Sequence, residues 1–191
     1  MKTKLIILAT FITLLSCKNS DQKVESEAKV ETTDSISNTA TQATENHGKA
    51  PDFSLADING KRFDLSDFKG KYVYMDIWAT WCGPCKVQIP YMKQLEEQFR
   101  DAPIHFVSVS VDNDDDKPVW AKMVRENEMS GVQLFAGREN NFGFDYKIQY
   151  IPTFILIDKE GNIINPTAPA PMDYQSQGVN QELVSILSSL K

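Results

Sequence analysis

A cysteine pair in residues 79–86 (Ala-Thr-Trp-Cys-Gly-Pro-Cys-Lys) constrains this chain more than any other feature. A mostly apolar run at 72–78, typical of a buried parallel strand, ends directly before it, and a helical pattern follows. We therefore expect Cys82 at a helix N-terminus, where unpaired N–H groups and the helix dipole favour a nucleophilic thiolate. Cys85 lies one turn later on the same face and can close a disulfide with Cys82. The pattern predicts thiol–disulfide exchange.

The same two cysteines could instead form a structural disulfide or half of a zinc site. A tetrahedral zinc site needs four ligands, usually Cys or His. The only histidines, His47 and His105, are not paired with another ligand at motif spacing. We therefore expect no metal site, and we expect His105 to be an ordinary strand residue.

The order of apolar and polar segments predicts an α/β domain. Asn59-Gly60 between two apolar runs, 51–55 and 61–65, indicates an N-terminal β-hairpin. Pro90 should bend the helix that follows the cysteines. Further strands are expected at 104–111, 132–135, 153–158 and 162–165, and helices at 83–100, 118–128, 141–147 and 178–190.

The acidic run at 112–116 could be read as the start of a calcium-binding loop. Such a loop needs a glycine at the position of Lys117 and a glutamate at the position of Met123, so the sequence does not fit a calcium site. We interpret the run as a solvated loop in which Asp115 or Asp116 caps the next helix. Val119, Met123 and Val124 should be the inward face of that helix.

The first 16 residues have the pattern of a secretory signal. Lys2 and Lys4 precede an apolar core at 5–15 that is too short to span a bilayer. The core ends in Leu-Leu-Ser-Cys, which resembles a bacterial lipobox, so we expect cleavage before Cys17 and lipidation of its thiol. An ordinary signal peptide with an incidental cysteine is the alternative.

Residues 17–49 would then form a lipidated, disordered tether. From 18 to 49 there is no aromatic residue and few large apolar ones, so this segment can bury too little apolar surface to offset the entropy lost on ordering.

Without residues 1–16 the chain has 18 basic and 26 acidic side chains, a formal charge of about −8, which argues against nucleic acid as a partner. The remaining residues, 50–191, suit one domain.

Residues 76–86 closely resemble the active-site segment of thioredoxin. Pro90 matches the proline that bends the first long helix of that fold, and Ile151-Pro152-Thr153 resembles its cis-proline loop. With the lipobox, the chain resembles membrane-anchored thiol–disulfide oxidoreductases of the TlpA/ResA group over residues 50–191. The resemblance implies a thioredoxin-like fold, with a central mixed sheet flanked by helices and the predicted hairpin as an N-terminal extension.

Asp76 lies in the middle of the predicted strand 72–78, so it should be buried and its pKa raised. The resemblance implies that it accepts the proton of Cys85; an aspartate that only hydrogen-bonds the backbone is the alternative. Many TlpA/ResA proteins carry asparagine at the position of Asp76 and glutamate at that of Gln88, so this chain departs from them at both. Gln88 cannot titrate.

The resemblance also implies a substrate-binding surface around the cysteines. Trp81, Gly83 and Pro84 would belong to it, and Trp78 would belong to the core. Ile151 would offer backbone groups to an extended substrate, beside Pro152 in the cis form.

The sequence therefore predicts an envelope enzyme that exchanges disulfides and needs no dissociable cofactor. A reductase of protein disulfides is favoured, because Gly83-Pro84 resembles the reducing thioredoxins. The expected partners are disulfide-containing envelope proteins, apocytochrome c among the compatible ones, and a membrane electron donor of the thiol-relay type. The expected location is periplasm-facing, at the outer membrane.

Two other functions are the alternatives, a peroxiredoxin and a non-enzymatic copper chaperone. Ala79 occupies the place of the threonine that a peroxiredoxin needs, and the cysteine spacing and the histidine of a copper chaperone are missing.

Overall fold

The structure is a computed structural model, and it describes residues 47–190. The predicted signal, the lipidation site Cys17 and nearly all of the predicted tether lie outside the described residues. His47 already donates its amide to Ile163, and Lys49 forms an isolated antiparallel bridge with Asn162. The pairing with the domain thus begins three residues before the predicted boundary at 50.

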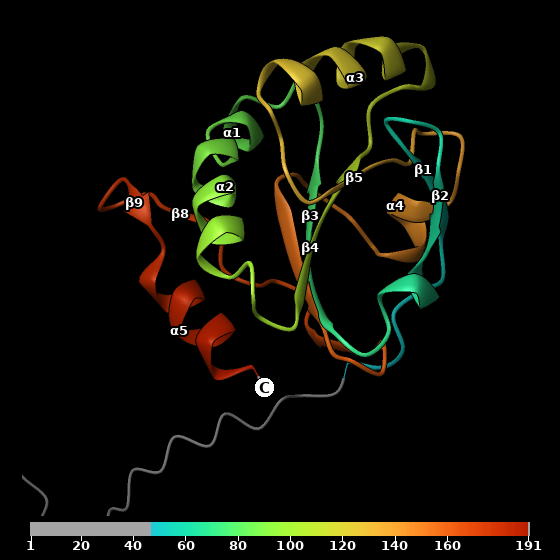
Figure 1. Ribbon diagram of the computed structural model, residues 1–191. Helices are drawn as coiled ribbons and strands as arrows, with labels where there is room; N and C mark the ends of the chain where they lie inside the picture. The colour runs from blue at the N-terminus through green and yellow to red at the C-terminus, as the bar shows by residue number, and fades with distance from the viewer. Residues whose placement is uncertain (1–46, 191) are drawn as a thin grey trace, which may run out of the picture. The chain divides into compact units, whose positions relative to one another are not determined.

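A seven-stranded mixed sheet is the centre of the domain (Figure 1). Its strand order is β2-β1-β5-β4-β3-β6-β7, with β3, β4 and β5 parallel and the other pairings antiparallel. The strand bounds are β1 Ser54–Asp57, β2 Arg62–Asp64, β3 Tyr72–Trp78, β4 Ile104–Ser110, β5 Val132–Phe135, β6 Thr153–Ile157 and β7 Ile163–Asn165. The α/β architecture and the mixed sheet are as predicted.

The N-terminal hairpin extends one edge of this sheet. β1 pairs with β2 across the turn that contains Asn59-Gly60, with Leu55 opposite Phe63, and β1 also pairs antiparallel with β5. The prediction of a hairpin extension is confirmed, although β1 begins at Ser54 and the predicted strand at 51. The 3₁₀ helix η1, Leu65–Phe68, follows and buries Leu65 and Phe68.

Alternating side chains of the central strands supply two apolar cores. On one face, Val73, Met75 and Ile77 of β3 pack with the hairpin and with α4, Phe142–Asp145. On the other, Tyr74 of β3 packs with the helices α2, Ile89–Gln98, and α5, Gln181–Ser189. Figure 1 shows α2 and α5 together on the side of the sheet opposite α4. Asp76, with the same parity as Tyr74, is directed toward the α2 side.

The helix after the cysteines is divided in two. α1 covers Gly83–Lys86, and α2 begins at Ile89 after an interruption at Val87 and Gln88. Pro90 has no N–H to donate to the carbonyl one turn earlier, so the regular hydrogen-bond ladder cannot run through this point. The predicted bend is therefore confirmed, and the structure resolves it as a break between two helices.

The helix after β4 buries a different set of side chains from the predicted one. The 3₁₀ turn η2, Asp114–Asp116, leads into α3, Lys117–Glu126, with Asp116 at the N-cap but without a side-chain cap hydrogen bond. Val124 is buried as predicted, but Val119 is 49% exposed and Trp120 is buried in its place. Met123 packs against the same cluster as Trp120 and Val124, so the inward face runs through residues 120, 123 and 124, and the large indole of Trp120 takes the place predicted for Val119.

The C-terminal segment corrects a second prediction. The expected helix at 178–190 begins only at Gln181, where the Asn180 side chain accepts the amides of Glu182 and Leu183. Before it, β8 Met172–Asp173 and β9 Gly178–Val179 form a short antiparallel hairpin that the sequence did not predict. Among residues 47–190, no helix has the length and apolar character that a bilayer crossing requires.

Candidate active site

Cys82 and Cys85 are joined by a disulfide at the start of α1, with their Cα atoms 5.3 Å apart. Cys82 is the N-cap of α1, and its sulfur accepts the Cys85 amide at 3.1 Å. Both cysteines are only 3% exposed. Because a backbone N–H points at the sulfur of Cys82, negative charge on that atom would be stabilised there. The predicted cysteine pairing is thus present in the structure, with Cys82 at the expected helix position.

The loop before Cys82 is anchored by a residue that the sequence did not single out for this role. Asp112, fully buried at the end of β4, accepts the Thr80 amide with both carboxylate oxygens at 3.0 Å and the Thr80 hydroxyl at 2.7 Å. The Ser110 hydroxyl donates to the same carboxylate at 2.7 Å. The interpretation of 112–116 as a solvated loop is therefore wrong for Asp112. The parallel pairing of β3 and β4, with Trp78 beside Ser110, brings their ends together, which sequence spacing alone does not reveal.

Asp76 is 7% exposed in the middle of β3. Burial raises its pKa to about 7; a hydrogen bond from Ser108 opposes this rise and the charge of Glu96 adds to it. The Ser108 bond is long, 3.5 Å, and the other oxygen, Oδ1, has no hydrogen-bond partner. The predicted burial and raised pKa are confirmed, and a carboxyl group with this pKa can exchange protons near neutral pH.

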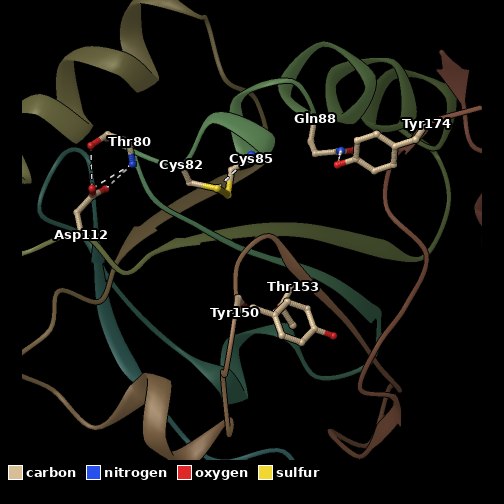
Figure 2. Close-up of a disulfide and its surroundings, with 8 residues drawn as sticks. All are labelled: Thr80, Cys82, Cys85, Gln88, Asp112, Tyr150, Thr153 and Tyr174. Carbon is tan, nitrogen blue, oxygen red and sulfur yellow. Dashed lines mark hydrogen bonds between the residues drawn. A yellow bond between two sulfur atoms is a disulfide. The ribbon is translucent and has the colours of Figure 1, made fainter.

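Gln88 is 1% exposed and connects the active-site helix to the unpredicted hairpin. Its side-chain oxygen accepts the Met172 amide at 2.9 Å, and its nitrogen donates to the Tyr174 hydroxyl at 2.7 Å. Figure 2 shows this pair on one side of the disulfide and the Thr80–Asp112 pair on the other. Where the resemblance implied a glutamate, this chain therefore has a neutral side chain with a structural role.

The cis-proline loop lies beside the cysteines. The Ile151–Pro152 peptide bond is cis, as the resemblance implied. Ile151 packs against the cluster that holds both cysteines and the buried Trp78. In Figure 2 the loop that carries Tyr150 and Thr153 faces the disulfide.

A groove of about 570 Å³ adjoins this loop. Trp81, Tyr150, Ile151 and Phe144 are among its lining residues, and the three aromatic side chains are 58%, 62% and 84% exposed. Exposed aromatic groups gathered at a cleft are typical of a docking surface. Trp81 and Ile151, both predicted to bind substrate, line this groove, and Tyr150 and Phe144, which the prediction did not name, line it with them. Gly83 and Pro84 are the first two residues of α1, directly after Cys82.

The remaining predicted residues have structural roles. Trp78 is 1% exposed, as expected for the core. His105 lies on β4 edge-on to the Phe68 ring, and partial burial lowers its pKa, which agrees with an ordinary strand residue.

Comparison with known proteins identifies relatives that share this site chemistry. The Redoxin family model matches residues 45–180. ResA of Bacillus subtilis, a thiol–disulfide oxidoreductase, is 36% identical over 121 residues, which are 60% of this chain and 63% of that protein, so this chain spans less than two thirds of its length.

Solved structures agree with the fold and the chemistry. A candidate thiol–disulfide oxidoreductase from Bacteroides vulgatus is 41% identical, with a TM-score of 0.62 over 75% of this chain and 91% of that one. The thioredoxin domain of another thiol–disulfide oxidoreductase from Bacteroides vulgatus is 26% identical, with a TM-score of 0.62 over 75% and 95%. The predicted thioredoxin-like fold is therefore confirmed.

Proposed function

The chain belongs to the Redoxin family and is a thiol–disulfide oxidoreductase, and on this premise we propose that it reduces protein disulfides through Cys82 and Cys85. The single observation that carries the proposal is the disulfide at the N-terminus of α1, with the Cys85 amide on the Cys82 sulfur. A thiolate at that position is the nucleophile, and the partner one turn later resolves the intermediate.

The proposed cycle has two exchange steps. In the reduced protein, the Cys82 thiolate attacks a substrate disulfide, forms a mixed disulfide and releases one substrate sulfur as a thiolate. Cys85 then loses its proton, with Asp76 as the acceptor through water, and attacks the Cys82 sulfur. The Cys82–Cys85 bond forms and the second substrate sulfur leaves, so the substrate gains two electrons and the enzyme loses two. No dissociable cofactor is required, because the electrons move between sulfur atoms.

The groove supports an extended protein segment as the substrate. It presents exposed aromatic side chains next to Ile151, whose backbone would pair with a substrate strand beside Pro152. Trp81, Gly83 and Pro84 would contact the residues around the substrate disulfide.

The setting in the cell is part of the proposal. The lipobox at Cys17 supports attachment to a membrane through a lipid, and Lys18 after it, in place of an aspartate that would retain the protein at the inner membrane, supports a periplasm-facing location at the outer membrane. Disulfide-containing envelope proteins, apocytochrome c among them, would be substrates, and a thiol-relay protein in the membrane would return electrons to Cys82 and Cys85.

Reduction of insulin by the full-length protein tests this function. Wild-type protein, recharged with a chemical dithiol, should reduce insulin; Cys82→Ser should not; and Cys85→Ser should accumulate a mixed disulfide. Consumption of hydrogen peroxide without insulin reduction would instead indicate the peroxiredoxin rival, and tight copper binding without either activity would indicate the chaperone. The trapped Cys85→Ser adduct in cells identifies the physiological substrate.

A further inference from the structure

A small crevice opens between α2 and the segment before β5, and two carboxyl groups line it. Asp76 from β3 and Glu96 from α2 both contribute, with Ser130 and Gln133. The space that the centre of a water molecule can occupy in the crevice is about 10 Å³, which is enough for roughly one water molecule. It shares no lining residue with the groove beside Trp81.

Two buried acceptor atoms in this crevice have no protein donor. They are Oδ1 of Asp76 and Oε1 of Gln133, whose side chains are 7% and 5% exposed. The side-chain nitrogen of Gln133 donates to the Ser130 carbonyl at 2.6 Å. Because the nitrogen and the oxygen lie on opposite sides of the side-chain amide, this hydrogen bond directs the oxygen away from that carbonyl. A buried polar atom without a partner is costly, and one water molecule can donate to both oxygens. The crevice therefore suits a water molecule against Asp76.

The chain is built to hold the Glu96 carboxylate at this place. The Ser130 hydroxyl donates to it, and Gly131 lies against it in the left-handed region at φ +67°. A Cβ atom at Gly131 would stand 2.8 Å from Oε1 of Glu96 and 2.8 Å from the Phe106 carbonyl, so a larger residue would displace the carboxylate. Glu96 is half-buried, and it extends the polar lining from Asp76 toward solvent.

The surroundings of Asp76 and Glu96 raise the pKa of both carboxyl groups, so a proton can be held by either of them. Burial raises the pKa of Glu96, while the Ser130 hydrogen bond and the charge of Lys93 lower it. Burial, and then the charge of Glu96, raise the pKa of Asp76 against the Ser108 hydrogen bond. Lys93 is also engaged outside the crevice, by the Asn127 carbonyl at 3.1 Å and Glu128 at 3.8 Å. From β3 itself, Tyr74 faces the same side, and its hydroxyl donates to the Pro169 carbonyl.

We propose that Asp76 and Glu96 form a proton route from the buried side of the active site to the α2 face, separate from the substrate groove. The inference rests on the proposed function, in which Asp76 takes the proton of Cys85. A substrate protein in the mixed disulfide covers the groove and the sulfur atoms. The crevice gives the released proton an exit that the substrate does not cover.

The Cys85 thiol gives its proton, through water, to the Asp76 carboxylate, and the Cys85 thiolate attacks the Cys82 sulfur. The Cys82–Cys85 bond forms, the bond from Cys82 to the substrate breaks, and the substrate sulfur leaves with the electron pair. The proton then passes through the crevice water to Glu96 and on to solvent. Glu96 touches neither sulfur; it positions and tunes Asp76.

Carboxyl titration by NMR on the full-length reduced protein tests the interaction directly. Glu96→Gln keeps an acceptor for Ser130 but removes the charge, so it should lower the pKa of Asp76. By reciprocity, Asp76→Asn should lower the pKa of Glu96. Glu97→Gln, the same change one residue along α2 on an exposed side chain that pairs with Arg100, should move neither. If Asp76 titrates identically in wild type and Glu96→Gln, the proposal is overturned.

Stopped-flow kinetics test the function of the pair, with attack and resolution measured separately from pH 6 to 9. Glu96→Gln should slow resolution by about threefold or more above pH 7 and shift its pH profile to lower pH, with attack unchanged. In the Asp76→Asn background, Glu96→Gln should have no further effect. Equal slowing in both backgrounds would make Glu96 merely structural and overturn the inference. Failure of the wild-type protein to attack a disulfide would instead overturn the proposed function.

Discussion

Gln88 and Tyr174, 86 residues apart in the sequence, are joined by a side-chain hydrogen bond of 2.7 Å beside the active-site disulfide. Gln88 also accepts the Met172 amide, and Tyr91, on the next turn, donates its hydroxyl to the Gln177 carbonyl at 2.9 Å. The β8–β9 hairpin is thus held to the helix region that follows Cys85 by three polar contacts. The buried Gln88 amide thus links segments that are far apart in the sequence.

Replacing Gln88 with alanine should loosen this hairpin. The change removes both partners at once, and the Met172 amide loses its acceptor, so we expect a loss of about 1–3 kcal/mol in the free energy of unfolding. Urea denaturation measures the loss, and hydrogen exchange should accelerate at Met172. Gln94→Ala, on the exposed side of α2, is the matched control and should stay within about 0.5 kcal/mol of wild type. Unchanged protection at Met172 would show that Gln88 does not hold the hairpin.

Cys82 should be the more reactive thiol of the reduced protein. Its sulfur receives the Cys85 amide at the start of α1, which favours the thiolate at Cys82. Timed alkylation at pH 7 followed by peptide mass spectrometry should find Cys82 modified first. Cys85→Ser should keep this fast reaction and Cys82→Ser should lose it. Faster modification of Cys85 in wild type would reverse the assigned roles.

Asp76→Asn should stabilise the protein at neutral and alkaline pH. In the folded protein the pKa of Asp76 is raised from 3.8 to about 7, so the native state holds a proton that the unfolded chain has lost across that window. The stability that this group contributes is present below pH 3.8 and is lost as pH rises through about 7. Asparagine stays neutral, so the variant should gain on the order of 2–4 kcal/mol above pH 7. Thermal or urea unfolding from pH 5 to 9 measures it, and exposed Asp101→Asn should follow wild type.

Asp112→Asn should impair both stability and attack by Cys82. Asparagine has one acceptor oxygen where the carboxylate serves the Thr80 amide, the Thr80 hydroxyl and the Ser110 hydroxyl. We expect a loss of about 2 kcal/mol in unfolding free energy and attack slower by about tenfold, because the loop that presents Cys82 loses its anchor. Thr80→Ser keeps the hydroxyl and should remain close to wild type. Normal attack by a folded Asp112→Asn variant would limit Asp112 to a role in stability.

Cys17→Ser tests the proposed lipid attachment. The variant should stay uncleaved or unlipidated, and it should no longer incorporate labelled palmitate or fractionate with membranes. Cys82→Ser serves as the control that removes a different thiol. Equal labelling of the Cys17→Ser variant would show that the lipobox is not used.

The sequence predicted what depends on local patterns and on motif order. β3 begins and ends at the predicted residues, because a mostly apolar run next to the cysteines has no competing interpretation. The pairing of Cys82 with Cys85, the burial of Asp76 and the cis form of Pro152 were predicted correctly, the last from the resemblance alone.

What it missed depends on contacts between distant segments. Asp112 resembled the four acidic or amide residues after it, and only the pairing of β3 with β4 brings it to Thr80. The β8–β9 hairpin has two residues in each strand, too few for an alternating pattern, and its partner Gln88 lies on another element. Glu96 was not singled out within the predicted helix 83–100, because its contact with Gly131 and its effect on the pKa of Asp76 arise only in the folded chain.

The Asp112 anchor also bears on how fast the enzyme can close its own disulfide. By tying Thr80 to the end of β4, it leaves the turn between β3 and α1 little freedom to swing when the sulfur–sulfur bond opens. Cys85 then remains within reach of Cys82 throughout the cycle, at a high effective molarity. Together with the loss of the Cys85 proton to Asp76, this closeness would keep a mixed disulfide short-lived, and the enzyme would escape from a poorly fitting protein by internal ring closure instead of remaining attached to it.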